Sequence, residues 1–130
     1  MIINAHCHRN LLDESCIQVA VYDDRLEVTS PGGLYNGLTY EEVMNGHSKI
    51  RNKGIANIFS QMGLVEAWGS GIKRILNAAE EYGLSKPRFQ EFDNMFRVEL
   101  FRSSFPMTNG KENIGGSVEN RPQRYTAKDY

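Results

Sequence analysis

At 130 residues with 40% hydrophobic content, the chain can bury one core of modest size, so we expect a single domain. Its 15 basic and 16 acidic side chains leave a net charge of −1, which excludes a global basic field that attracts nucleic acid. The apolar runs are too short for a membrane span, and two cysteines without a signal-peptide pattern predict a cytoplasmic protein with reduced thiols.

The first third of the chain predicts a short helix followed by a β-hairpin. Residues 1–10 have a helix-compatible pattern without a capping residue, so we expect the end of a helix whose beginning is absent. Apolar and polar residues then alternate over roughly 15–22 and 25–30, on either side of Asp23-Asp24. This alternation predicts two antiparallel strands joined by a hairpin turn.

The middle of the chain predicts a long loop and two helices. Residues 30–53 are rich in Pro, Gly and polar types, broken by one helical turn that Thr39 can cap. Apolar residues spaced by three and four then predict helices over roughly 54–62 and 70–82, each with one buried face. The residues of these faces are Ile55, Ile58, Phe59 and Met62 in the first helix and Trp68, Ile72, Ile75 and Ala79 in the second.

The last third predicts a second hairpin and a polar tail. Phe96, Val98 and Leu100 alternate with polar residues, and Asp93-Asn94 separates them from an upstream strand around Phe89. After Arg102 the sequence has too few apolar residues to offset its ordering entropy. We therefore expect a domain over residues 1–102 and a disordered tail or linker over 103–130.

Two glycine clusters are candidates for a binding site. Gly69-Ser70-Gly71 begins the second long helix, where unpaired N–H groups and the helix dipole favour a phosphate. Taken alone, these glycines are more simply explained by a flexible turn with a close helix contact, since short glycine patterns occur by chance. The segment 30–34, SPGGL, is most simply a turn. Neither the P-loop nor the Rossmann fingerprint is present.

The remaining polar clusters favour no reaction. His6-Cys7-His8 with Cys16 has the residue types of a zinc site, but residues two apart on a helix point to different sides. We therefore expect buried cysteines that act as small hydrophobic residues. DNA binding by the tail is disfavoured because acidic neighbours nearly cancel its basic residues. Those basic residues are Lys111, Arg121, Arg124 and Lys128.

Four motifs resemble one protein family in their order and spacing. They are NAHCHRN at 4–10, DDRLEVTSPGGL at 23–34, SKIRNKGIANIF at 48–59 and LVEAWGSGIKRI at 64–75. The family is the GHKL-like ATPase domain, of the HATPase_c_4 type, in bacterial AlbA-domain (Schlafen-like) transcriptional regulators, often labelled RecG-like or helicase-related. The resemblance implies a two-layer α/β sandwich: a truncated Bergerat fold with helices on one face of a small, mostly antiparallel or mixed sheet.

The resemblance also implies a nucleotide site. Asn4 matches the asparagine that holds Mg²⁺ on the phosphates of ATP in GHKL proteins. The family's catalytic glutamate would lie one position before Met1, so no catalytic residue is assigned. Residues 34–52 lie where these proteins carry a lid over ATP, although a solvated loop of charges fits as well. The candidate phosphate contacts in that segment and directly after it are Lys49, Arg51 and Lys53.

Two glycine boxes complete the implied site. The first places Ser30 and Leu34 where strict GHKL enzymes have Asp and Gly, which weakens the expectation of adenine selectivity. The second box would cradle phosphates with its N–H groups. The residues implied to bind the nucleotide are Gly32, Gly33, Gly69, Ser70, Gly71 and Ile72.

Two functions remain open at this point. The first is binding of ATP or another purine nucleotide that switches a transcription regulator, without hydrolysis in this chain and with DNA contacted only through another domain or subunit. The second is a non-enzymatic dimerisation or interaction module that has lost the nucleotide. A missing first strand would leave a sheet edge and apolar surface uncovered, so we also expect a homo-oligomer.

Overall fold

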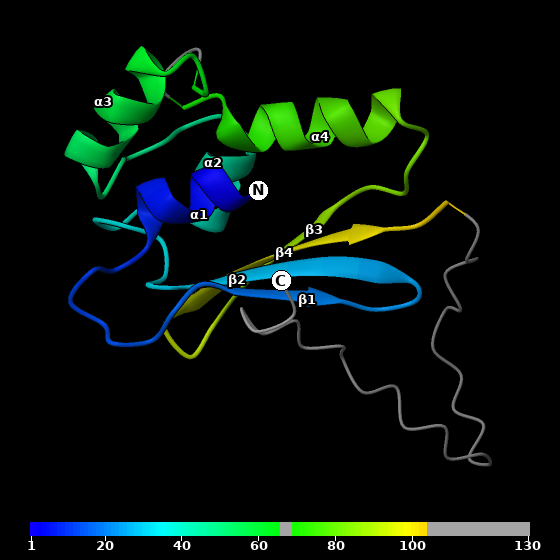
Figure 1. Ribbon diagram of the computed structural model, residues 1–130, viewed down its shortest axis with the longest axis horizontal. Helices are drawn as coiled ribbons and strands as arrows, with labels where there is room; N and C mark the ends of the chain where they lie inside the picture. The colour runs from blue at the N-terminus through cyan, green and yellow to red at the C-terminus, as the bar shows by residue number, and fades with distance from the viewer. Residues whose placement is uncertain (66–68, 104–130) are drawn as a thin grey trace, which may run out of the picture.

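Helices cover one face of a β-sheet in the computed structural model, which describes residues 1–65 and 69–103 (Figure 1). The helices are α1 (Ile2–His8), α2 (Tyr40–Met44), α3 (Lys53–Gln61) and α4 (Gly71–Glu81), and the strands are β1 (Gln18–Val21), β2 (Arg25–Pro31), β3 (Arg88–Phe92) and β4 (Met95–Phe101). All these helices lie on the same side of the sheet in Figure 1. The predicted two-layer α/β sandwich is therefore confirmed.

The sheet has the strand order β1-β2-β4-β3 among the described residues. Each pairing between the described strands is antiparallel, in agreement with the expected mostly antiparallel or mixed sheet. Short turns join β1 to β2 and β3 to β4, and a short turn can only reverse the chain. Asp93 and Asn94 have φ values of 46° and 58°, as a two-residue hairpin turn requires. Both predicted hairpins are confirmed.

The hydrophobic core lies between the sheet and α4. Val28, Val98 and Phe89 occupy one face in register across β2, β4 and β3, and Ile75 of α4 packs against Val98 and Phe89. Fully burying a side chain of this size stabilises a fold by about 1.5–3 kcal/mol. This core forms the bottom of the space between the two layers.

The apolar face of α3 is narrower than predicted. Ala56 is buried, but Ile58 and Met62 are 57% and 64% exposed, so their predicted burial is wrong. The reason is that α3 packs against α1, with an edge-to-face contact between Phe59 and His6. A neighbouring helix covers a thinner strip of side chains than a sheet does.

The opposite face of the sheet carries an ionic network. Glu27 and Glu99 are direct partners across β2 and β4 and are only 6% and 2% exposed. Arg25 Nε lies 2.8 Å from Glu27, Arg97 Nε lies 3.7 Å from Glu27, and Arg88 forms a bidentate pair with Glu99. Burial raises the pKa of Glu99, but the hydrogen bond and charge of Arg88 outweigh burial and bring that pKa below its usual range. Both carboxylates are thereby compensated.

The two cysteines, which were both expected to be buried, differ in exposure. Cys7 is buried as predicted, but Cys16 is exposed because it lies in the loop between α1 and β1, away from the core.

Trp68 and residues 104–130, which include nearly all of the predicted tail, lie outside the described residues. No helix in the described ranges combines the length and apolar character that a membrane span needs.

Candidate functional site

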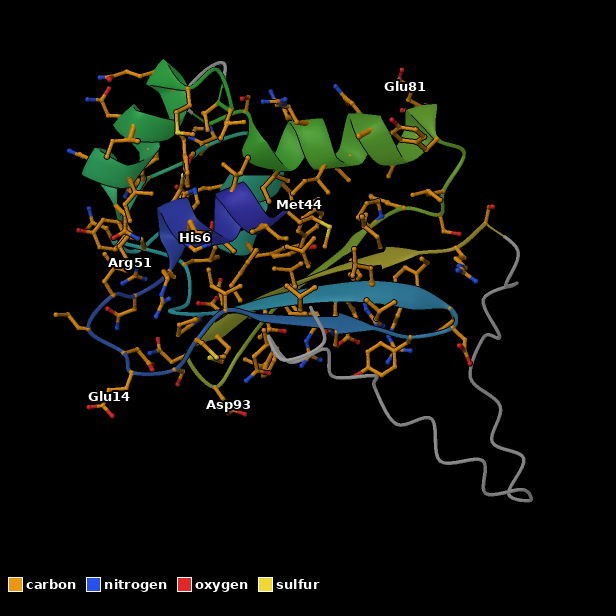
Figure 2. All side chains as sticks on the ribbon, viewed as in Figure 1. His6, Glu14, Met44, Arg51, Glu81 and Asp93 are labelled. Atoms are coloured by element: carbon orange, nitrogen blue, oxygen red, sulfur yellow. The ribbon has the colours of Figure 1, made fainter. Side chains whose placement is uncertain are left out.

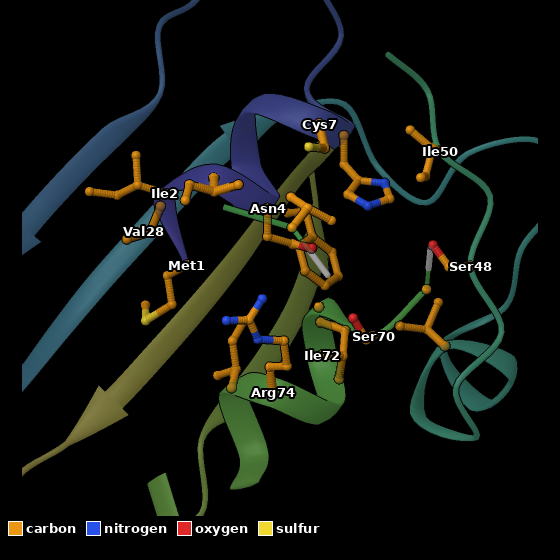
Figure 3. A pocket seen from close by; sticks show the side chains of 18 of the residues that line it. Met1, Ile2, Asn4, Cys7, Val28, Ser48, Ile50, Ser70, Ile72 and Arg74 are labelled. Atoms are coloured by element: carbon orange, nitrogen blue, oxygen red, sulfur yellow. The ribbon is translucent and has the colours of Figure 1, made fainter. Parts of the chain in front are cut away.

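A cavity of about 700 Å³ lies between the helices and the sheet (Figure 3). Val28, Phe96 and Leu100 from the strands form part of an apolar floor. Its walls come from α1, from the loop after β2 and from the beginning of α4. Cavities of this volume are typical of small-molecule sites.

Asn4 and Gly71 meet at one wall of this cavity. Figure 3 shows Asn4 pointing from α1 toward the beginning of α4. A Cβ atom added at Gly71 would lie 2.5 Å from Asn4 Oδ1, so the missing side chain at Gly71 makes room for the amide. The fold therefore brings together the predicted metal ligand and the predicted phosphate-binding turn.

The first backbone N–H groups of α4 have no partner within the helix itself. The first helical bond runs from the Arg74 N–H to the Ser70 carbonyl, at 2.9 Å. The N–H groups of the three residues before Arg74 have no carbonyl of the helix to pair with. Gly69 has a φ of +87°, which favours glycine, and a Cβ there would lie 3.3 Å from Ser48 Cβ. The segment 69–72, which forms the second glycine box, lines the cavity, and its contact with phosphate stays a prediction.

The turn at Gly32 and Gly33 lines the cavity but uses its amides elsewhere. Gly32 N–H donates to the Asn94 carbonyl at 2.7 Å, and Leu34 N–H donates to Glu91 Oε1 at 2.7 Å. The φ of Gly32 is +97°, so a side chain there would be strained. This turn shapes the cavity while its N–H groups hold the β3–β4 hairpin.

Arg51 makes contacts that its predicted role did not include. Its Nε donates to the His8 carbonyl at 3.0 Å and its Nη2 to the Gly33 carbonyl at 2.8 Å. The guanidinium carbon lies 4.7 Å from the centre of the Tyr35 ring. Figure 2 shows Arg51 beside the C-terminal end of α1. Arg51 is not among the residues that line the cavity, so its predicted phosphate contact stays a prediction.

The charged side chains among the described lining residues are basic. Lys49 lines the cavity and also an adjoining hollow, which Lys53 lines as well. Arg74 extends from α4 toward α1 in Figure 3, and sequence reasoning missed it. Its signal was its position four residues after Ser70, on the same helix face. None of the described lining residues is Asp or Glu, so the cavity suits an anion.

Two titratable groups on α1 line the same cavity. Burial, together with the charge of Arg51, lowers the pKa of His8, so its imidazole is neutral at pH 7. Burial raises the pKa of Cys7, which keeps its thiol protonated. Neither group adds a negative charge that would oppose an anionic ligand.

A family model and a solved structure are similar to this chain. A family model described as "Putative ATP-dependent DNA helicase recG C-terminal" matches residues 14–100, a range that contains both glycine boxes and Arg51 but not Asn4. The solved structure of the DIP2311 protein from Corynebacterium diphtheriae is similar, with 28% identity and a TM-score of 0.69. The similarity covers 78% of this chain and 22% of that chain, so this chain spans about a fifth of its length. No curated protein matches the chain.

Proposed function

Because the chain belongs to the HATPase_c_4 family, and is thus an ATPase-like domain related to the RecG C-terminal region, we propose that it binds ATP or another purine nucleotide with Mg²⁺. In this proposal the bound nucleotide switches a bacterial transcriptional regulator. DNA is contacted through another domain or subunit, because the net charge of −1 provides no basic surface of the required extent.

The observation that carries the proposal is the contact between Asn4 and Gly71. The amide oxygen of Asn4 is a hard donor of the type that Mg²⁺ prefers, and it lies against the terminus of α4, whose first N–H groups have no partner within the helix. Mg²⁺ is usually held by few protein ligands together with phosphate oxygens and water. One asparagine beside a phosphate-binding turn therefore fits such an ion, which would neutralise phosphate charge.

The other lining residues suit the rest of a nucleotide. The floor formed by Val28, Phe96 and Leu100 offers an apolar surface to a base, and Lys49 and Arg74 offer charge to phosphates. Ser30, which replaces the family's adenine-binding Asp, does not line the cavity. We therefore propose a purine nucleotide without strict selection of adenine.

Binding without hydrolysis follows from the charge of the cavity. A carboxylate that activates water contributes roughly a hundred- to ten-thousand-fold to the rate. The described lining residues include no carboxylate that could take this role. Such a site retains the nucleotide, which is what a switch requires.

A second candidate function is an interaction module. Val19 and Val21 of the outer strand β1 are 47% and 46% exposed, and an outer strand with apolar side chains favours pairing with another chain. The internal use of the Gly32 and Leu34 amides favours the same candidate.

Calorimetry separates the two candidates. ATP is titrated into the chain with and without Mg²⁺, and the same titrations are repeated with Asn4→Ala. Saturable heat that Mg²⁺ strengthens in the wild type but not in Asn4→Ala supports the nucleotide function. Heat equal to that of buffer injections in both titrations rejects it in favour of the interaction module.

A further inference from the structure

Two consecutive residues, Arg51 and Asn52, cap the C-terminal end of α1. The last carbonyl groups of a helix have no partner within it, and here residues 6–9 offer four in succession. The acceptors are the carbonyls of His6 and Arg9 for Asn52 Nδ2, at 3.0 and 2.8 Å, of Cys7 for Asn52 N–H, at 2.9 Å, and of His8 for Arg51 Nε, at 3.0 Å. All four are thus satisfied by a segment distant in the sequence.

The same arginine closes the loop that lines the cavity. Arg51 Nη2 donates to the Gly33 carbonyl, at the beginning of the loop, and the guanidinium covers the Tyr35 ring. Arg51 itself stands at the loop's end. One side chain therefore connects both ends of the loop over residues 34–50 with the helix that carries Asn4.

We propose that Arg51 and Asn52 are positioning residues that hold α1, and with it Asn4, in register with the loop over the nucleotide. This proposal rests on the proposed function. Arg51 acts through α1 and not on a phosphate, because its Nε and Nη2 donate to backbone carbonyls and its side chain does not line the cavity. The Mg²⁺-dependent part of nucleotide affinity should then depend on residues that touch neither ion nor nucleotide.

The first test measures amide hydrogen exchange in the full chain without nucleotide. Arg51→Lys keeps the charge but lacks the planar guanidinium that donates to both carbonyls. Asn52→Asp keeps the size of the side chain but loses its Nδ2 donor. Lys86→Gln, an exposed cation that lines neither hollow, is the control. We expect the α1 amides to exchange about fivefold faster for each bond lost, while β4 amides are unchanged. Unchanged α1 exchange in both variants overturns the proposal.

The second test measures ATP affinity with and without Mg²⁺ by calorimetry. Outer residues that orient a metal ligand are typically worth about ten- to hundred-fold in affinity, so we expect Arg51→Lys to lose a Mg²⁺-dependent gain of that order. Its affinity for ATP without Mg²⁺ should match that of Lys86→Gln. Two results would overturn the proposal and indicate that residue 51 contacts phosphate. One is wild-type affinity for ATP with Mg²⁺ in Arg51→Lys, and the other is an equal loss of affinity with and without Mg²⁺. If the wild type binds no ATP, the proposed function fails, and the exchange rates alone decide the positioning role.

Discussion

Gly71→Ala should weaken nucleotide binding without destabilising the fold. The new Cβ would lie 2.5 Å from Asn4 Oδ1 and 3.4 Å from its Cγ, so the amide oxygen must retreat by about 1 Å to reach ordinary contact. A displacement of that size misplaces a ligand for an ion that demands near-ideal geometry. We expect affinity for ATP with Mg²⁺ to fall on the order of ten- to hundred-fold.

Stability should change in the opposite direction. Gly71 does not have a positive φ, so alanine can adopt its conformation and stabilises the fold by about 0.4–1 kcal/mol through the unfolded state. The atom that must move is the end of a flexible side chain, which limits the cost.

Gly54→Ala is the matched control for this substitution. Gly54 lies in the first turn of α3, and a Cβ there meets nothing within 4 Å. It should therefore gain similar stability in urea denaturation and keep wild-type affinity in calorimetry. Wild-type Mg²⁺-ATP affinity in Gly71→Ala, or a fold less stable than the wild type, would refute the reasoning about Asn4.

Three further predictions concern the ionic network, turnover and assembly. Arg88→Ala should lower the free energy of unfolding at pH 7 by about 1–3 kcal/mol, less than for a fully buried pair because Arg88 is half exposed. The folded state holds the pKa of Glu99 below its unfolded value, which contributes stability at pH values above the unfolded pKa and loses it as pH falls through the folded pKa. Urea denaturation at pH 3 should therefore show a smaller difference in free energy of unfolding between the wild type and Arg88→Ala. An equal difference at both pH values would contradict this. ATP turnover should not exceed the buffer rate, and turnover that Asn4→Ala abolishes would show hydrolysis after all. Light scattering at tens of micromolar protein should give a homo-oligomer that Val21→Lys, on the outer strand and outside the cavity, converts to monomer, whereas a wild-type monomer would disprove the expected assembly.

The elements of the fold were predictable because their signals are local. Alternation of apolar residues and the Asp93-Asn94 turn specify the second hairpin, and Thr39 caps α2 with Glu42 in a capping box. The exposure of Ile58 was not predictable in the same way. Apolar spacing shows which residues share a helix face, but whether a sheet or another helix covers that face depends on distant parts of the chain.

The candidate site also contains features with a local sequence signal and features without one. Residues 69–72 carry their signal in glycine and in their place at the beginning of a helix, and the structure puts them at the cavity, with Gly71 beside Asn4. The hydrogen-bond partners of Arg51 are backbone carbonyls, which every residue type has, so no pattern of side chains in the sequence indicates them. The sequence therefore identifies Arg51 as a candidate cation but does not show which groups accept its hydrogen bonds.

The capping of α1 has a consequence for the order of folding. Isolated helices shorter than about 12–15 residues are marginal in water, and α1 has seven residues and no side-chain hydrogen bond at its N-cap. Its C-terminal carbonyls are satisfied only when residues 51 and 52 arrive across more than 40 positions of chain. We expect α1 to form after the transition state, so that Asn52→Ala accelerates unfolding and leaves the folding rate nearly unchanged, with a φ-value near zero in a chevron analysis.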